Sequence, residues 1–219
     1  MTPDYDRAAI LAAETLIKHS VSSAPVDPIP ILKKTPGVLL VSFESVSQDV
    51  DQPRRCVMNS YGENNQDAFT ACNVNNGRRQ YIVTYNQRLP LFMIQRALAR
   101  ELGHIVLGHD GSLPEDVRND EAKAFANHLL VPRALIHSIL ATNLRLTVDL
   151  LGNVTGCYDY CLSCIRRLPG AHVPAELNQI IRDNFMPYAV NLFDFQRVAT
   201  RKDGSALADF GSYMDGYEE

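Results

Sequence analysis

The sequence predicts an α+β protein: a mostly helical domain with a small antiparallel sheet before its central helix, and a helical C-terminal subdomain. Three observations support this class. Apolar residues recur at helical spacing through most of the 219 residues. An Asn-Gly step at residues 76–77 joins two runs typical of strands. The helix predicted at 90–107 is largely apolar but carries one polar face. We expect domains at 1–140 and 141–200, followed by an acidic, Gly-containing tail at 201–219.

The composition is that of a soluble globular protein, with 46% hydrophobic and 21% charged residues. The net charge of −4 argues against a general nucleic-acid binder. No apolar run reaches the roughly 18 residues of a membrane span. The N-terminus carries acids at Asp4 and Asp6, where a secretory signal needs basic residues. Five cysteines, an odd count, suit reduced thiols. We therefore expect a cytoplasmic protein without membrane contact.

The N-terminal third combines a helix, an irregular connection and a strand. Residues 4–19 carry apolar side chains near a helical period, with Thr2 as the expected N-cap and Pro3 in the first turn. Three prolines between positions 25 and 30 make the connection irregular, and a single helical turn is expected at 31–34. The short apolar run at 37–43 predicts a buried strand.

The central part of the chain predicts a hairpin followed by two helices. The runs 69–73 and 79–85 flank the Asn-Gly turn and form the antiparallel sheet. A helix follows at about 90–107, with Pro90 in its first turn and Gly108 at its end. Another helix at about 114–129 carries small alanines, which would let it approach the first helix closely.

The C-terminal part reads as helix, turn, helix over 146–168, with another helix at 173–197 and a flexible tail from Arg201. A DNA-reading second helix would need basic and polar side chains along it, and this one offers only Arg166 and Arg167 at its end. Direct nucleic-acid binding is therefore not expected.

The helix at 90–107 carries an incomplete metal-binding motif. Arg100, Glu101 and His104 lie on one face of this helix, within an arc of about 100° around its axis. Glu101-x-x-His104 is most of H-E-x-x-H, in which two histidines one turn apart bind Zn²⁺ and the glutamate acts as general base. Here arginine takes the first position. Arginine stays cationic and has no lone pair to donate, so it cannot be a metal ligand.

Downstream residues make a family resemblance specific. The run Arg100-Glu-Leu-Gly-His-Ile-Val-Leu-Gly-His109 is followed by Glu121-Ala-Lys-Ala-Phe-Ala-Asn-His-Leu-Leu-Val-Pro132, and preceded by Tyr81-Ile-Val-Thr-Tyr-Asn86. Over roughly residues 78–132 this resembles the ImmA/IrrE family of zincin-like metallopeptidases. The resemblance implies a gluzincin-type fold and a small helical subdomain after the Leu-Leu-x-Pro signature. It places Glu101 at the general base and His104 and Glu121 at the second and third zinc ligands. Arg100 takes the place of the first ligand.

Arg100 itself has two interpretations. Without a metal, Glu101 and Glu121 would repel each other, and burying them unpaired would be costly. A guanidinium supplies positive charge and a fork that fits a carboxylate. One hypothesis is that Arg100 pairs with Glu121 and partly replaces the metal. In the other, Arg100 turns to solvent and the site is degraded.

Two functions follow from these interpretations. In the first, zinc is held by His104, Glu121 and an unidentified group, and Glu101 deprotonates the metal-bound water of an endopeptidase. The family resemblance suggests a protein substrate such as the repressor of a mobile element or stress regulon. In the second, the fold persists as a metal-free docking module for such a repressor or another protein. The sequence favours the second function and leaves the first open.

Three further signals have structural alternatives. Gly103 indicates either close packing or room beside His104. Cys157, Cys161 and Cys164 have the spacing of an iron–sulfur loop, but the same spacing makes one face of a helix, and no cluster is expected. His109 lies about 140° further round the helix than His104, so we interpret it as a structural histidine and not a substitute ligand.

Overall fold

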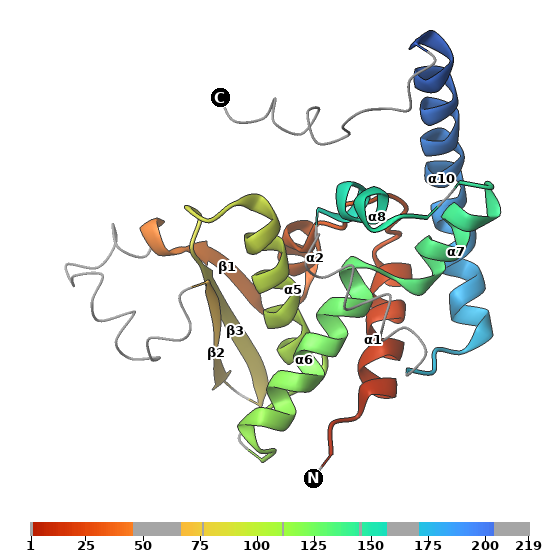
Figure 1. Cartoon of the computed structure of the whole chain (residues 1–219). Helices are drawn as coiled ribbons and strands as arrows, with labels where there is room; N and C mark the ends of the chain where they lie inside the picture. Colours follow the sequence, from red (N-terminus) through yellow and green to blue (C-terminus); the bar gives the residue numbers. More distant parts are fainter. Residues whose placement is uncertain are drawn as a thin grey trace. The chain divides into compact units, whose positions relative to one another are not determined.

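A computed structural model describes residues 2–45, 67–75, 77–110, 112–144, 146–156 and 171–203 (Figure 1). The described residues form mostly helices together with one small sheet, which confirms the α+β class. The chain divides into two compact units, one of residues 1–11 and 27–126, the other of residues 12–26 and 127–219. The helices are α1 Tyr5–Lys18, α2 Pro28–Lys34, α5 Leu91–Val106, α6 Glu115–Leu130, α7 Arg133–Ala141, α8 Val148–Thr155 and α10 Ala175–Asp203.

Helix α1 begins later than its sequence suggests. The side chain of Asp4, not Thr2, caps it: Asp4 Oδ1 accepts from the backbone N–H of Arg7 at 2.9 Å, and the Asp4 carbonyl accepts from Ala8 N at 3.2 Å. An aspartate followed by three free N–H groups satisfies the helix start better than a threonine two residues earlier. This cap fixes the backbone of Asp4, which reappears in the candidate site.

The sheet contains β1 Val38–Ser42, β2 Ala68–Asn75 and β3 Arg78–Tyr85 in the order β1-β3-β2. Strands β2 and β3 form the predicted antiparallel hairpin, and Gly77 turns the chain with a φ of +73°. The prediction of a purely antiparallel sheet is wrong for β1, which pairs in parallel with β3. A short turn forces consecutive strands to be antiparallel, whereas the long connection that follows β1 leaves either direction open.

The expectation that β1 is buried is also wrong. It lies at an edge of the sheet, and Leu39 is 57% exposed. A short apolar run does not distinguish a central strand from an edge strand.

Helix α5 covers the sheet and carries the motif (Figure 1). It contacts β2, β3 and α2 and buries Leu98 and Leu102 completely. Its start after Pro90 and its end before Gly108 confirm the predicted bounds within one residue. At the C-terminus, Gly108 N donates to Ile105 O at 3.1 Å and His109 N donates to His104 O at 3.0 Å. This is a Schellman motif, made possible by the positive φ of Gly108, and it turns His109 back over the last helical turn.

Helix α6 packs closely on α5 at Gly103. A Cβ at this position would lie 3.1 Å from the Ala122 carbonyl oxygen and 3.1 Å from the ring of Phe125. The glycine therefore serves close packing, as one of the two interpretations predicted. The same approach brings the first turns of α6 alongside the polar face of α5.

The second unit is helical. Helices α7 and α10 contact each other, and the buried Ser138 hydroxyl lies 3.0 Å from the Ala134 carbonyl and 3.1 Å from the Arg182 carbonyl. Helix α8 begins at an N-cap, Thr147, and ends at Gly156 in the left-handed conformation. The predicted helix at 158–168, with the three cysteines and both arginines weighed above, lies outside the described residues, as does the tail after 203.

Within the described part of the chain, the stretch Glu115–Ala141 alone is long and apolar enough to cross a membrane. Because 61% of its apolar window is buried inside the protein, it resembles a core helix and is weak evidence for a span. The cytoplasmic location stays a prediction.

Candidate functional site

The polar face of α5 borders a pocket of about 210 Å³. Arg100, Glu101 and His104 share this face as the sequence predicts. Glu101 is almost fully buried at 5% exposure, whereas the Arg100 side chain is 31% exposed. Arg100 Nη2 lies 3.4 Å from Glu101 Oε1. This distance is longer than that of a typical N–H···O hydrogen bond. The other lining residues come from β2, β3, the end of α5 and α6: Phe69, Thr70, Cys72, Tyr81, Ile105, His109, Glu115, Arg118 and Asn119.

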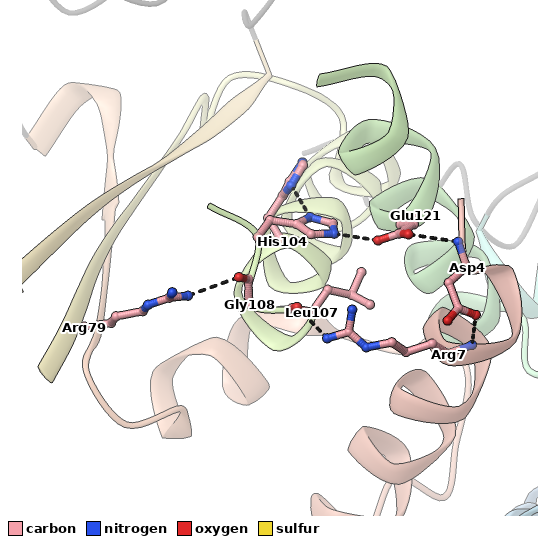
Figure 2. Close-up of polar contacts among 8 residues, drawn as sticks. Asp4, Arg7, Arg79, His104, Leu107, Gly108 and Glu121 are labelled. Atoms are coloured by element: carbon pink, nitrogen blue, oxygen red, sulfur yellow. Dashed lines mark hydrogen bonds and ion pairs between the residues drawn. The ribbon is translucent and has the colours of Figure 1, made fainter. Parts of the chain in front are cut away.

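A chain of hydrogen bonds leads from His104 into the protein (Figure 2). His104 Nδ1 lies 2.9 Å from His109 Nδ1, and His109 Nε2 lies 2.9 Å from Glu121 Oε2. The other carboxylate oxygen, Glu121 Oε1, accepts from the backbone N–H of Asp4 at 2.8 Å. The side chains of His109 and Glu121 are only 2% and 5% exposed. Glu121 thus lies beyond His109 and does not line the pocket.

The partners in this chain determine where its protons lie. The Glu121 carboxylate is an acceptor, so His109 Nε2 carries the hydrogen of that bond. The two Nδ1 atoms share a single hydrogen. With both rings neutral, His109 Nδ1 is the acceptor and His104 Nδ1 the donor, which leaves His104 Nε2 with a lone pair. Each polar atom of His109 and each oxygen of Glu121 then has a partner.

Burial shifts the pKa values of both motif residues. Burial lowers the pKa of His104 to about 3, and electrostatic interactions with His109, Arg100 and Arg118 act in the same direction. Burial raises the pKa of Glu101, and the nearby Arg100 partly opposes this shift. The imidazole of His104 is therefore neutral at ordinary pH, and Glu101 holds a proton more readily than a free glutamate.

Two arginines fix the turn that positions His109 (Figure 2). Arg7 Nη2 donates to the Leu107 carbonyl at 2.8 Å, and Arg79 Nη1 donates to the Gly108 carbonyl at 3.1 Å. These carbonyls end α5 and have no partner within the helix, so cationic donors there also complement the helix dipole. The N-terminal segment contributes twice, through Arg7 and through the backbone of Asp4.

The predicted pairing of Arg100 with Glu121 is wrong. Both oxygens of Glu121 are bonded elsewhere, and Arg100 reaches Glu101, its neighbour on the same helix. The physical reason is the Schellman turn, which inserts the His109 ring between α5 and the carboxylate of α6. The structure also places His109 beside His104, although a continued helix would point it about 140° away. The signal for this was Leu107-Gly108, because glycine after a helix end reverses the chain.

The class of protein follows from comparison of the sequence with family models. The model described as the IrrE N-terminal-like domain, Peptidase_M78, matches residues 57–154. The chain therefore carries a domain of the ImmA/IrrE family, and the resemblance read from the motif is confirmed. The zincin-like fold is implied by this family. Comparisons with curated proteins and with solved structures found no match.

The donor set does not fit the zinc ion that the family implies. Arg100 has no lone pair, Glu121 lies outside the pocket with a hydrogen bond at each oxygen, and His104 uses Nδ1 to bond His109, so His104 Nε2 is the donor atom of the expected set that stays available on the pocket side. Within the described part of the chain, no group of three or more His, Cys, Asp or Glu side chains could hold a metal ion. A closed zinc site needs about four ligands, and a catalytic one about three from the protein.

Proposed function

We propose that this ImmA/IrrE-type protein is a binding module for a protein partner and not a zinc peptidase. The observation that carries the proposal is the position of Glu121, which accepts hydrogen bonds from His109 and Asp4 outside the pocket, while arginine replaces the first ligand. A protein with this family fold but without the metal would still have the pocket, but it would lack the Lewis acid that a zinc peptidase needs. The partner we expect is the kind that the family resemblance implies, a transcriptional repressor of a mobile element or stress regulon.

The position of the pocket supports recognition of an extended peptide. Phe69, Thr70 and Cys72 of β2 line it, and β2 pairs with β3 on one side only. In the described part of the sheet, the outer backbone groups of β2 have no strand partner. An edge strand beside a pocket can add a peptide strand, with main-chain bonds supplying affinity and the pocket supplying specificity.

A second candidate, the active zinc endopeptidase, rests on Glu101. This carboxyl lines the pocket beside His104, and burial raises its pKa in the direction that suits a general base. For this function, His104 and Glu121 would have to bind zinc with another group. Such an enzyme would lose peptide turnover when Glu101 is replaced by glutamine.

Metal analysis separates the two functions. Protein purified without chelator should contain far less than one zinc per chain if the docking module is correct. Arg100→His restores the family motif but leaves Glu121 bonded to His109, so we expect it to bind zinc weakly. The matched control is Arg96→His, one turn earlier on an exposed part of α5. Near-stoichiometric zinc in the unchanged protein, with turnover abolished by Glu101→Gln, would establish the endopeptidase.

A further inference from the structure

Two arginines line the pocket from different helices. Arg100 comes from α5 and Arg118 from the first turns of α6, and both line the pocket together with His104. Both are near enough to His104 to act on its charge. Two arginines from different elements that border one small cavity provide two hydrogen-bonding forks for a single ligand.

The protein leaves most of these donors unused. Arg100 makes one long contact, with Glu101 at 3.4 Å, and its Nε is buried without a partner. The Nε of Arg118 is also buried without a partner, and no ion pair of the described residues includes Arg118. A guanidinium has five N–H donors. Two cationic groups that border one small cavity also repel each other, and an anion between them would relieve that repulsion.

The acids around the pocket limit the charge of this anion. Glu101 and Glu115 line it as well, so the two arginines do not create a large positive excess. A monoanion gains from both forks and meets moderate repulsion. A phosphate dianion would meet about twice that repulsion from the same carboxylates. The planar carboxylate also matches the arginine fork.

We infer that the pocket binds a carboxylate of the partner protein between Arg100 and Arg118, where related peptidases would hold their metal. This inference rests on the proposed docking function and names the chemistry it recognises. The carboxylate comes from an acidic side chain or from the C-terminus of the partner. Arg100 is then a recognition residue whose replacement by histidine would remove half of the anion site.

The test is a titration of the full ¹⁵N-labelled chain, followed through the side-chain Nε–H signals of its arginines. One peptide carries a single glutamate between alanines with both ends blocked, and its control carries glutamine. A blocked-N-terminus alanine peptide with a free C-terminal carboxylate separates the two sources. Inorganic phosphate is the fourth probe. We expect at least one carboxylate peptide to shift Arg100 and Arg118, and the glutamine peptide to leave both unchanged.

Variants sharpen the result. Arg118→Gln should weaken binding of the carboxylate peptide about tenfold or more, because a hydrogen bond to a charged group is lost. Arg118→Lys should recover part of this affinity through its charge. Arg96→Gln, on an exposed part of α5, should bind as the unchanged protein does. Since the comparison of glutamate with glutamine uses the natural chain, it does not depend on how the variants fold.

Three outcomes would overturn the inference: neither carboxylate peptide shifts the two arginines, the glutamine peptide binds as well as the glutamate peptide, or phosphate binds while both carboxylates fail. Zinc is measured in the same samples. Stoichiometric zinc would reject the docking function itself. Metal-free protein without a carboxylate response would reject the anion site and leave the docking function standing.

Discussion

The two sides of His104 differ in how completely their polar groups are bonded. On the inner side, His109, Glu121 and the Asp4 backbone form a closed chain with distances of 2.8 to 2.9 Å. On the pocket side, Arg100 makes one contact at 3.4 Å and Arg118 has an unpartnered buried Nε. Buried polar groups in proteins are normally satisfied. The inner side therefore serves the structure, and the pocket side is the part that we propose binds a ligand.

This difference separates two glutamates that the family motif would treat as one catalytic set. Glu121 belongs to the bonded side, and Glu101 belongs to the pocket. Mutations should reflect the division: changes on the inner side should cost stability, and changes on the pocket side should affect ligand binding more than folding.

The largest effect is expected from Glu121→Ala. It leaves the buried His109 Nε2–H and the Asp4 N–H without their acceptor, which should lower the free energy of unfolding by about 3 kcal/mol. Urea unfolding measures this change. Glu115→Ala, an exposed position on the same helix, should change it by less than about 0.5 kcal/mol. If Glu121→Ala instead increased stability, Glu121 would be an unpaired carboxylate of a metal site.

The pH dependence of stability should report on His104. Its folded pKa of about 3 lies below the ordinary value of 6.5, so the unfolded chain takes up this proton first. The contribution of His104 to stability is therefore complete above pH 6.5 and is lost as the pH falls toward 3. We expect a loss of the order of 2 kcal/mol, allowing for the partial exposure of the ring.

His104→Gln removes this titration. The stability advantage of the natural protein over the variant should shrink steadily as the pH falls from 6.5 to 3, measured by urea unfolding at each pH. An advantage that stays constant over this range would mean that the ring is not buried as described.

Gly103→Ala tests the close approach of α5 and α6 that supports both sides. The added methyl group would lie 3.1 Å from the Ala122 carbonyl oxygen. Overpacking costs about 1–3 kcal/mol, and alanine regains about 1 kcal/mol of helix propensity. We expect a net loss of about 1 kcal/mol in thermal unfolding. A gain in stability would show that the helices separate easily and that the site is less fixed than its bonding indicates.

The smallest effect is expected from Arg7→Ala, which removes the bond to the Leu107 carbonyl. This should cost about 0.5–1 kcal/mol, since the arginine is largely exposed. The exposed Arg96→Ala is the control. A cost equal to that of Glu121→Ala would mean that the N-terminal segment, and not the carboxylate, determines the position of His109.

Local patterns in the sequence predicted much of this arrangement. The Asn-Gly step gave the β2–β3 hairpin, and Pro90 and Gly108 gave the ends of α5. The shared face of Arg100, Glu101 and His104 followed from helical spacing. The parallel pairing of β1 was not predictable, because no short turn constrains it. Neither was the bond from Asp4 to Glu121, which joins residues 117 positions apart and uses a backbone atom that carries no sequence signature.

The role of His109 lies between these cases. Its partners depend on the Schellman turn at Gly108, which the sequence indicates, and on the approach of α6, which only the packing at Gly103 determines. A histidine just beyond a helix-ending glycine should therefore be placed back over the helix and not further along it.

The histidine rings give the most direct test of the account. In long-range ¹H–¹⁵N spectra at pH 8, where imidazoles are neutral, His104 should carry its proton on Nδ1 and His109 on Nε2. One equivalent of zinc should leave both signals unchanged. Zinc-dependent signals from His104, with loss of the hydrogen bond between His109 and Glu121, would show that the carboxylate is a metal ligand and would contradict the account.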